Sequence, residues 1–228
     1  MRLAKYLASC GVASRRKCEE YITGGRVSVD DKIISDVATN VIGAEKIAVD
    51  GKIVKPNSLV YYLLNKPTGY TCSLYDPHAK NLANELVPND PLVWPVGRLD
   101  RDTSGLLIFT NDGELTNRLT HPKFKKEKEY VVTVDRPLSV MEIARMRKGI
   151  ELEDGLFRPD RFSEISAGKY QMTVHEGRNR LIRRSIEHFG KGVMHLERTK
   201  VGKITLAGLS SGKYRVLTKS ELESLKNA

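Results

Sequence analysis

Three aspartates lie close together in GRLDRDTSGLLIFTNDG, residues 97–113, within a chain that is otherwise strongly basic. A carboxylate there could cap a helix, pair with an arginine, hold a metal, or act as a nucleophile or base. Asp112 precedes a stretch with helical periodicity and is best explained as an N-cap. Asp102 is placed to bond the amides of its own turn in an Asx-type arrangement. Asp100 has no such local role, and spacing alone leaves its function open.

The overall composition points to a polyanionic partner. Among 228 residues the formal net charge is +10, and the sequence pI is about 9.5. Such an excess of positive charge favours nucleic acid as a partner and says nothing about the fold. With 40% hydrophobic residues, the chain is long enough for one ordinary domain and a small second one.

Several classes of protein are disfavoured by what the sequence lacks. No apolar run approaches the roughly 18 residues that span a bilayer, so we expect no membrane partner. Residues 1–21 carry charges through their apolar part and do not resemble a signal peptide. The three cysteines form no C-x-x-C pair, the five histidines have no metal-binding spacing, and no P-loop motif occurs. We therefore predict a reduced cytoplasmic protein with no metal and no cofactor.

Residues 1–54 are predicted to form a small domain of two helices followed by a small sheet. Apolar residues first recur at helical spacing, and Ser14 is placed to cap the second helix. The pattern then changes to alternation, and a DD turn and a DG turn each join two short strands. The polar stretch KPNS, residues 55–58, is the expected linker to a second domain over residues 59–228.

The second predicted domain alternates strands and helices without a strict repeat. Strands are expected over 59–67, 105–110, 128–134, 169–177, 193–202 and 212–218, and helices over 113–121, 139–149, 177–190 and, short and frayed, 220–227. Asp112 and Ser139 are the expected N-caps. Because regular crossover helices do not separate the strands, we predict an α+β fold with a largely antiparallel sheet.

Cationic side chains gather in three separate segments, SRRK (14–17), KFKKEKEY (123–130) and GRNRLIRR (177–184). At the first, a phosphate would meet the free N–H groups of a helix N-terminus together with three long cations. A solvated face is the ordinary explanation for one such cluster, but three of them favour contact with a phosphate backbone. The residues expected to make these contacts are Arg15, Arg16, Lys17, Lys125, Lys126, Arg178, Arg180 and Arg184.

Three arginines of the predicted helix over 177–190 share one face. Arg180, Arg183 and Arg184 are spaced i, i+3 and i+4, and like charges at such spacing repel by roughly a few tenths of a kcal/mol. That cost suggests that at least one of them binds a carboxylate or a phosphate.

Four motifs extend this picture because they occur in the order found in a known family. LNKPTGY, GRLDRDTSGLLIFTNDGEL, KEYVVTV and EGRNRLIRR together resemble the bacterial ribosomal pseudouridine synthases of the RsuA/RluB type. The similarity runs from Arg2 to about Leu217, and residues 1–54 resemble the S-four-type RNA-binding domain of ribosomal proteins. The resemblance implies a small α-L-type RNA-binding domain and a pseudouridine synthase domain, whose mixed, largely antiparallel sheet is flanked by helices. YDPH and LTHPKFKKEKEY favour a large-subunit target.

The same resemblance implies roles for particular residues. Asp100 corresponds to the catalytic aspartate, Tyr130 to the tyrosine beside the target uracil, and Arg183 to the arginine paired with that aspartate. Arg98 is assigned to RNA contact or substrate placement, and the NKP motif at residues 65–67 to structural support of the site.

The chain departs from the family beside Arg183. Leu181-Ile182 stands where Gln-Val is common, and Ser185 where Met is frequent. These changes remove no charged group, so they bear on target choice and local packing more than on activity.

The implied reaction fits these residue types. Conversion of uridine to pseudouridine breaks the N1–C1′ bond, turns the base and joins C5 to C1′, with no redox step. A carboxylate would attack or deprotonate at C1′ or C2′, so Asp100 has to stay ionised where water is excluded. We expect the guanidinium of Arg183 beside it to offset its desolvation. A stacked uracil must also be flipped out, and Tyr130 offers a flat face to hold it.

Three other activities stay open at this point. A non-catalytic RNA-binding or ribosome-assembly factor would need only the basic surfaces. A glycosylase would use the same Asp100 but release free uracil, and a metal-dependent nuclease would use Asp100 together with Asp102. The expected partner is ribosomal RNA or an assembling ribosomal particle, and we expect a monomer.

Overall fold

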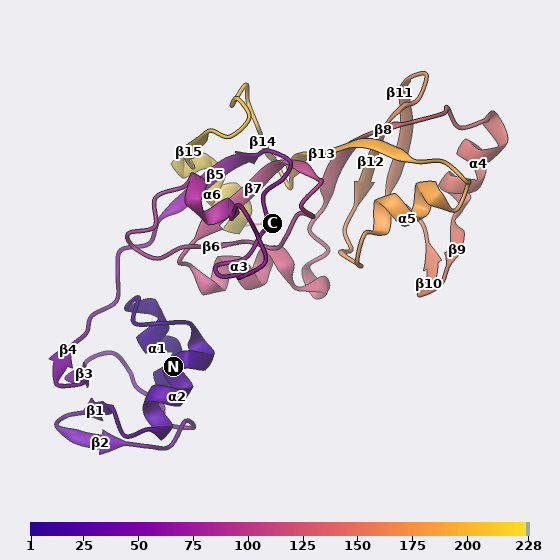
Figure 1. Ribbon diagram of the computed structural model, residues 1–228. Helices are drawn as coiled ribbons and strands as arrows, with labels where there is room; N and C mark the ends of the chain where they lie inside the picture. Colours follow the sequence, from indigo (N-terminus) through magenta and orange to yellow (C-terminus); the bar gives the residue numbers. More distant parts are fainter. Residues whose placement is uncertain (227–228) are drawn as a thin grey trace. The chain divides into compact units, whose positions relative to one another are not determined.

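The computed structural model describes residues 1–226, which divide into two compact units (Figure 1). The first, called the N-terminal unit, comprises residues 1–60 together with residues 90–92. The second, called the C-terminal unit, comprises residues 61–89 and the chain from Val93 onward. Each unit has its own hydrophobic core, and each is described by itself.

The N-terminal unit combines two short helices with a four-stranded antiparallel sheet. Its elements are α1 (Leu3–Ser9), α2 (Arg15–Thr23), β1 (Val27–Val29), β2 (Lys32–Ile34), β3 (Ile47–Val49) and β4 (Lys52–Ile53), in the strand order β2-β1-β3-β4. As predicted, the Ser14 side chain caps α2 by accepting a hydrogen bond from the Lys17 amide at 3.3 Å. Fully buried side chains of both helices, such as Leu7 and Ile22, form the core with β3.

A large mixed sheet forms the centre of the C-terminal unit. Its strands are β5 (Tyr61–Lys66), β6 (Trp94–Pro95), β7 (Ser104–Thr110), β8 (Lys128–Val134), β11 (Arg161–Ser166), β12 (Lys169–Val174), β13 (Val193–Val201), β14 (Ile204–Thr205) and β15 (Tyr214–Val216). The main path is β11-β12-β8-β13-β7-β5-β15, while β6 pairs with β7 and β14 with β13. Among the described strands, the pairing of β13 with β7 is parallel and the other pairings are antiparallel. The predicted α+β class with a largely antiparallel sheet is confirmed.

Helices cover the two halves of this sheet and create two cores. α4 (Val140–Lys148) and α5 (Leu181–Glu187) pack on the half that contains β8 and β12, and α3 (Gly113–Thr120) and α6 (Lys219–Lys226) pack beside β5 and β7 (Figure 1). The short helices η1 (Ala83–Leu86) and η2 (Pro122–Phe124) and the hairpin of β9 (Ile150–Leu152) and β10 (Gly155–Phe157) complete the unit. Strand β13 belongs to both halves, since it pairs with β8 and with β7.

Local capping signals place two of these helices. The Asp112 carboxylate accepts hydrogen bonds from the amides of Glu114 and Leu115 at 2.9 and 3.0 Å. Ser139 and Glu142 form a reciprocal capping box at the start of α4. Both predicted N-caps are therefore confirmed.

Several elements differ from the sequence-based expectation, which did not include β6, β11, β14, η1 or η2. The helix expected from residue 177 begins only at Leu181, because Arg180 takes a left-handed backbone conformation with φ +47°. The β9–β10 hairpin was not predicted, since its strands of three residues are too short to show alternation. The last helix is anchored rather than frayed, because Leu225 is fully buried against α3, while Asn227 lies outside the described residues.

Candidate active site

The loop between β6 and β7 carries Asp100 and is fixed from inside by a buried lysine. The Lys66 side chain is fully buried, and its Nζ donates to the carbonyl oxygens of Asp100 and Thr103 at 3.2 and 2.8 Å and to that of its own neighbour at 3.0 Å. Burial lowers the pKa of Lys66, and three carbonyl oxygens satisfy its three N–H donors. The structural support expected from the NKP motif comes from this ammonium group.

Two backbone contacts hold the same loop from neighbouring segments. The Leu99 amide donates to the Sγ of the buried Cys72 at 3.4 Å, and the Gly69 amide donates to the Arg101 carbonyl at 2.7 Å. The backbone on both sides of Asp100 is therefore fixed. Its own carboxylate forms no hydrogen bond or ion pair within residues 1–226 and borders a cavity.

That cavity, of about 300 Å³, brings together the three residues expected to do chemistry. Asp100, Tyr130 and Arg183 all line it, although they come from a loop, from β8 and from α5. Apolar side chains of α5 and β13 complete much of the wall. Residues more than 80 positions apart in the chain thus meet at one place, although their roles stay a prediction.

Arg183 is almost completely buried, with 6% of its surface exposed, and it binds the loop that carries Asp100. Its Nη2 donates to the Asp102 carbonyl at 2.9 Å and lies 3.2 Å from the Asp102 carboxylate, while its Nη1 donates to the Val193 carbonyl at 3.3 Å. Its Nε is buried with no hydrogen-bond partner among the described residues. The direct ion pair expected between Arg183 and Asp100 is not formed, because the turn presents Asp102 to α5 instead.

Asp102 does not form the Asx-type turn that its spacing predicts. Its carboxylate lies 3.2 Å from Arg183 and 3.5 Å from Arg180, and the Thr103 amide donates to the Asp100 carbonyl at 3.1 Å instead. Two guanidinium groups are stronger partners for a carboxylate than the amides of its own turn. Asp102 is therefore structural in a different way: it links the Asp100 loop to the start of α5.

Tyr130 lies at the edge of the core that α5 covers. It is half-buried on β8, directly opposite Met172 on β12 and Arg198 on β13. Its ring packs against this core and also lines the 300 Å³ cavity. An aromatic ring held in this way presents a rigid apolar surface to a molecule that enters the cavity.

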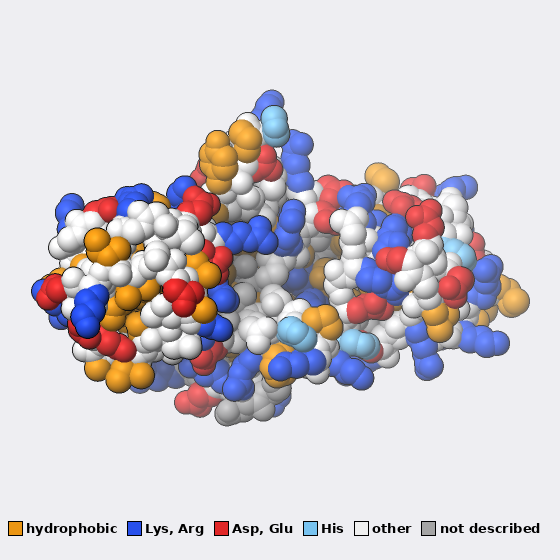
Figure 2. Space-filling model, turned by 90° about the horizontal axis from the view of Figure 1, so that it is seen from below, with side chains coloured by type: hydrophobic (Ala, Val, Ile, Leu, Met, Phe, Trp, Pro, Cys, Tyr) orange, Lys and Arg blue, Asp and Glu red, His pale blue; other side chains and the backbone are white. Residues whose placement is uncertain are grey.

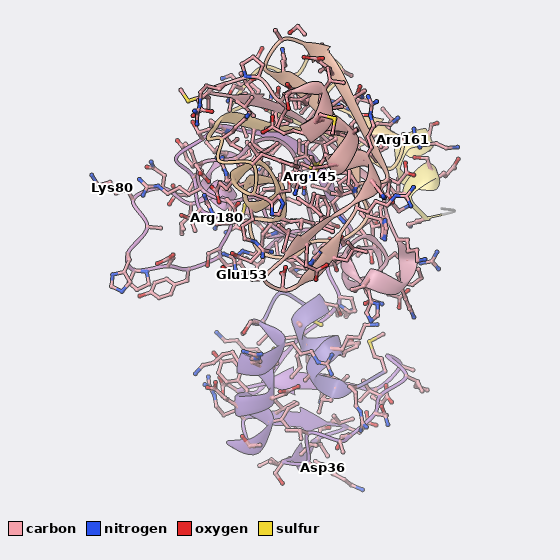
Figure 3. All side chains as sticks on the ribbon, turned by 90° about the vertical axis from the view of Figure 1, so that its right-hand side faces the viewer. Asp36, Lys80, Arg145, Glu153, Arg161 and Arg180 are labelled. Atoms are coloured by element: carbon pink, nitrogen blue, oxygen red, sulfur yellow. The ribbon has the colours of Figure 1, made fainter. Side chains whose placement is uncertain are left out.

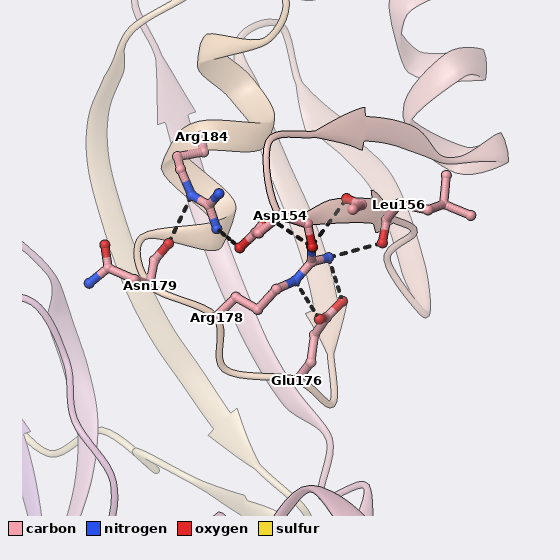
Figure 4. A network of polar contacts seen from close by, with 7 residues as sticks. Asp154, Leu156, Glu176, Arg178, Asn179 and Arg184 are labelled. Atoms are coloured by element: carbon pink, nitrogen blue, oxygen red, sulfur yellow. Dashed lines mark hydrogen bonds and ion pairs between the residues drawn. The ribbon is translucent and has the colours of Figure 1, made fainter.

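The loop after β12, which also borders the cavity, is tied to the β9–β10 hairpin by two arginines (Figure 4). Arg178 contacts both carboxylate oxygens of Glu176 at 2.8 and 3.2 Å, pairs with Asp154 at 2.9 Å, and donates to hairpin carbonyls. Arg184 pairs with the other oxygen of Asp154 at 2.7 Å and donates to the Asn179 carbonyl at 2.9 Å. The Arg184 guanidinium lowers the pKa of Asp154. Asp154 thus connects the hairpin turn to this loop.

Of the cations expected to contact RNA, six are exposed, two are bonded inside the protein and one is buried. The exposed ones are Arg15, Arg16, Lys17, Arg98, Lys125 and Arg180, and basic side chains are spread over the face seen in Figure 2. The guanidinium groups of Arg178 and Arg184 are bonded inside the protein. Lys126 is only 6% exposed, and desolvation lowers its pKa, so it does not lie on the surface as expected.

Three residues of this region were not among the expected site residues: Lys128, Asp154 and Arg198. The signal for Lys128 was its position two residues before Tyr130 on one strand, which places both side chains on one face. The signal that could have found the hairpin turn with Asp154 is the DG pair at residues 154–155, which did not enter the sequence-based expectation. Nothing local in the sequence marks Arg198, because its place depends on strand pairing.

Comparisons with known proteins agree with this fold. A family model for RNA pseudouridylate synthases matches residues 60–188, and an S4 domain model matches residues 1–45. An RNA pseudouridine synthase of Aquifex aeolicus (strain VF5) is 42% identical over 235 residues, which cover 100% of this chain and 94% of that protein. Ribosomal large subunit pseudouridine synthase B of Bacillus subtilis (strain 168) is 39% identical over 232 residues, with 99% and 95% covered.

A solved structure shows the same architecture. The crystal structure of a pseudouridylate synthase matches this chain with a TM-score of 0.72 and 28% identity, and 99% of each chain is covered. This chain belongs to the RNA pseudouridine synthase family, and it is of the RsuA/RluB type with an N-terminal S4 domain. It is therefore an RNA-modifying isomerase. Within residues 1–226, no helix has the length and apolar character needed to cross a membrane.

Proposed function

We propose that this chain isomerises a specific uridine of ribosomal RNA to pseudouridine, with Asp100 as the catalytic carboxylate. The observation that carries the proposal is the single cavity lined by Asp100, Tyr130 and Arg183. The large subunit is the favoured target, since the Bacillus subtilis relative is named as a large-subunit enzyme and the YDPH stretch is typical of that type. The substrate is the free rRNA or an assembling particle.

Asp100 is the group that we assign to attack or proton removal at the sugar. Lys66 fixes its backbone, and its carboxylate oxygens have no internal partner within residues 1–226. The buried guanidinium of Arg183 lies in the wall of the same cavity and supplies a positive charge there. Cleavage of N1–C1′, rotation of the base and formation of C5–C1′ then need no external oxidant or cofactor.

Tyr130 is the residue that we assign to holding the flipped uracil. A uracil stacked in RNA is not accessible at C1′, so it must leave its stack before Asp100 can reach the sugar. The half-buried ring of Tyr130 supplies a flat surface in the cavity that replaces part of the lost stacking.

RNA contacts outside the cavity complete the proposal. Arg15, Arg16 and Lys17 are exposed at the start of α2, and we assign the S4-type unit, residues 1–54, to rRNA binding. The loop that carries Lys80 projects from the C-terminal unit (Figure 3), and it includes YDPH with a Tyr75 that is 79% exposed. A loop with an exposed tyrosine and a lysine suits contact with an unstacked base. We expect a cytoplasmic monomer.

Release of tritium tests this proposal. In a large-subunit rRNA transcript labelled with tritium at uridine C5, formation of the new C5–C1′ bond expels the label into water. Purified chain is expected to release tritium from the free transcript or from assembling particles of cells that lack the gene. Mapping pseudouridines in rRNA from cells with and without the gene then identifies the nucleotide. No release from either substrate would overturn the proposal.

The same assay separates the other activities. A glycosylase would release free uracil and leave an abasic site, and an assembly factor would release nothing. A metal-dependent nuclease would cut the transcript and be stopped by a chelator. That activity is disfavoured by Asp102, whose carboxylate is already paired with Arg183 and Arg180.

A further inference from the structure

A second cavity adjoins the candidate active site and shares part of its wall. It measures about 640 Å³, and Arg98, Tyr130 and Arg178 line both cavities. Apolar side chains from β7, α3 and β13 form much of its remaining wall. Two further cations, Lys128 and Arg198, line this second cavity and are absent from the lining of the first.

Strand geometry explains why these two cations lie beside Tyr130. Lys128 and Tyr130 are two residues apart on β8, so their side chains point to the same face of the sheet. Arg198 on β13 is the direct cross-strand partner of Tyr130, and such partners share a face. The aromatic ring therefore has one cation next to it along its strand and another across the ladder.

Neither cation has a carboxylate partner within residues 1–226. Arg198 is 3% exposed and its Nε donates to a β7 carbonyl at 2.8 Å, while the Nζ of Lys128 donates to the Lys126 carbonyl at 3.3 Å. Burial and repulsion by Arg198 together lower the pKa of Lys128 to about 8. The carboxylate in this lining, that of Glu176, is bound by Arg178 through both oxygens. A buried and a partly buried like charge without a counter-ion raise the free energy of the folded chain.

We propose that the second cavity binds a backbone phosphate of the RNA next to the target nucleotide, with Lys128 and Arg198 as its cationic ligands. A phosphate supplies the missing negative charge, and guanidinium and ammonium groups are its usual protein partners. The apolar wall contacts the sugar or base of the same neighbouring nucleotide. This inference rests on the proposed function, since an RNA in the first cavity is what places a phosphate one nucleotide away from Tyr130.

The phosphate site predicts opposite effects on stability and on binding. Lys128→Met keeps a long side chain and removes a partly buried, unpaired charge, so the Tm of the full chain is expected to rise by about 2–4 °C. If Lys128 only supported the fold, its replacement by methionine would lower the Tm. Affinity for RNA is expected to fall in the same variant by about 10-fold, because one charge-assisted contact is lost.

The salt dependence of RNA binding measures how many phosphates the protein contacts. The probe is a large-subunit rRNA transcript, titrated with the full chain at a series of KCl concentrations. For Lys128→Met, the slope of log K against log salt is expected to fall in magnitude by about 0.7, the value for one single-strand phosphate. Lys128→Arg should keep the slope. Lys148→Met removes an exposed lysine at the end of α4 that lines neither cavity, and should also keep it.

Measuring the Tm with inorganic phosphate shows whether the second cavity binds a phosphate that is not part of RNA. It also distinguishes failure of the phosphate site from failure of the proposed function. Phosphate alone is expected to raise the Tm of the wild-type chain more than that of Lys128→Met. If wild type neither binds the transcript nor releases tritium but keeps this phosphate effect, the proposed function fails and the cavity is a site for free phosphate. If wild type releases tritium while Lys128→Met has an unchanged slope and a lowered Tm, the phosphate site is overturned and the proposed function survives.

Discussion

Two basic segments that look alike in the sequence have different surroundings in the structure. In SRRK, residues 14–17, the cations are exposed on the first turn of α2, and their ion pairs are with glutamates of the same helix at 3.6 and 2.5 Å. In GRNRLIRR, residues 177–184, arginines bond to Asp154 and Asp102, which belong to other segments. Exposed pairs contribute little, whereas partly buried networks fix the backbone. The first segment is open to RNA, and the second mainly shapes the cavity.

The difference arises from tertiary contacts rather than from composition. The segment 177–184 contacts both the β9–β10 turn and the Asp100 loop, and each of them contributes a carboxylate. The third basic segment, KFKKEKEY, is intermediate, because Lys125 is exposed while Lys126 is buried. Positive charge in a sequence therefore indicates a polyanionic partner for the chain without showing which cations contact it.

The largest difference between the two segments is expected when one arginine of each is replaced: Arg183 in residues 177–184 and Arg16 in residues 14–17. Arg183→Met leaves the Asp102 and Val193 oxygens without their donor, so the free energy of unfolding should fall by about 2–3 kcal/mol and tritium release should be lost. Urea unfolding measures the first effect. The matched control, Arg16→Met in the exposed segment, should change stability by less than about 0.5 kcal/mol. Equal effects of the two variants would refute the distinction.

Asp154→Asn should have the next largest effect, because it weakens two arginine contacts at once. We expect lower stability and a lower turnover rate, while Glu164→Gln, which removes an exposed carboxylate with no ion pair among the described residues, should change neither. Because Arg184 lowers the Asp154 pKa, this stabilisation is complete above about pH 4 and is lost as pH falls through the folded-state pKa. Acid titration of stability should show that loss in wild type and not in Asp154→Asn.

The exposed segment should affect RNA binding without affecting the fold. Replacing Arg15, Arg16 and Lys17 together by glutamine should reduce the slope of log K against log salt by about 2–3 and leave the Tm unchanged. Removal of residues 1–54 should likewise weaken binding to rRNA while the site stays folded. Filter binding and circular dichroism measure these quantities. Equal affinity of the shortened and full-length chains would exclude the S4-type unit from rRNA binding.

The smallest expected effect is at the third basic segment and compares adjacent lysines. Lys125→Gln should weaken binding to the rRNA transcript by about 2- to 3-fold, because an exposed cation near a phosphate contributes modestly. Lys126→Met should leave affinity within about 2-fold, since the buried ammonium does not reach a surface phosphate. A larger loss for Lys126→Met than for Lys125→Gln would show that burial is a poor guide to RNA contact here.

Features decided by neighbouring residues could be predicted from the sequence. The caps formed by Ser14, Asp112 and Ser139 each depend on amides within three residues, so a local pattern contains all the information needed. Strand alternation and the DG turn of the first unit are equally local. The motifs placed Asp100, Tyr130 and Arg183 as candidates, and the structure adds that they share a cavity.

Features decided by distant residues could not be predicted in the same way. The Arg183–Asp102 contact joins residues 81 positions apart, and periodicity does not show which of two nearby aspartates an arginine selects. The left-handed Arg180, which delays the start of α5, is compatible with a helical pattern in sequence. The role of Asp154 depends on two arginines beyond the hairpin that carries it. In each case a contact between two distant segments decides the conformation. The sequence pattern of either segment alone does not show that contact.

The most direct test of this account is tritium release by Asp100→Asn, which keeps the size of the side chain and removes its negative charge. The loop backbone is held by Lys66, so the variant should fold and bind the rRNA transcript as wild type does. Tritium release is predicted to fall by about 1000-fold or more, because the group assigned to the sugar is gone. Release at the wild-type rate by a folded, RNA-binding Asp100→Asn variant would contradict the assignment.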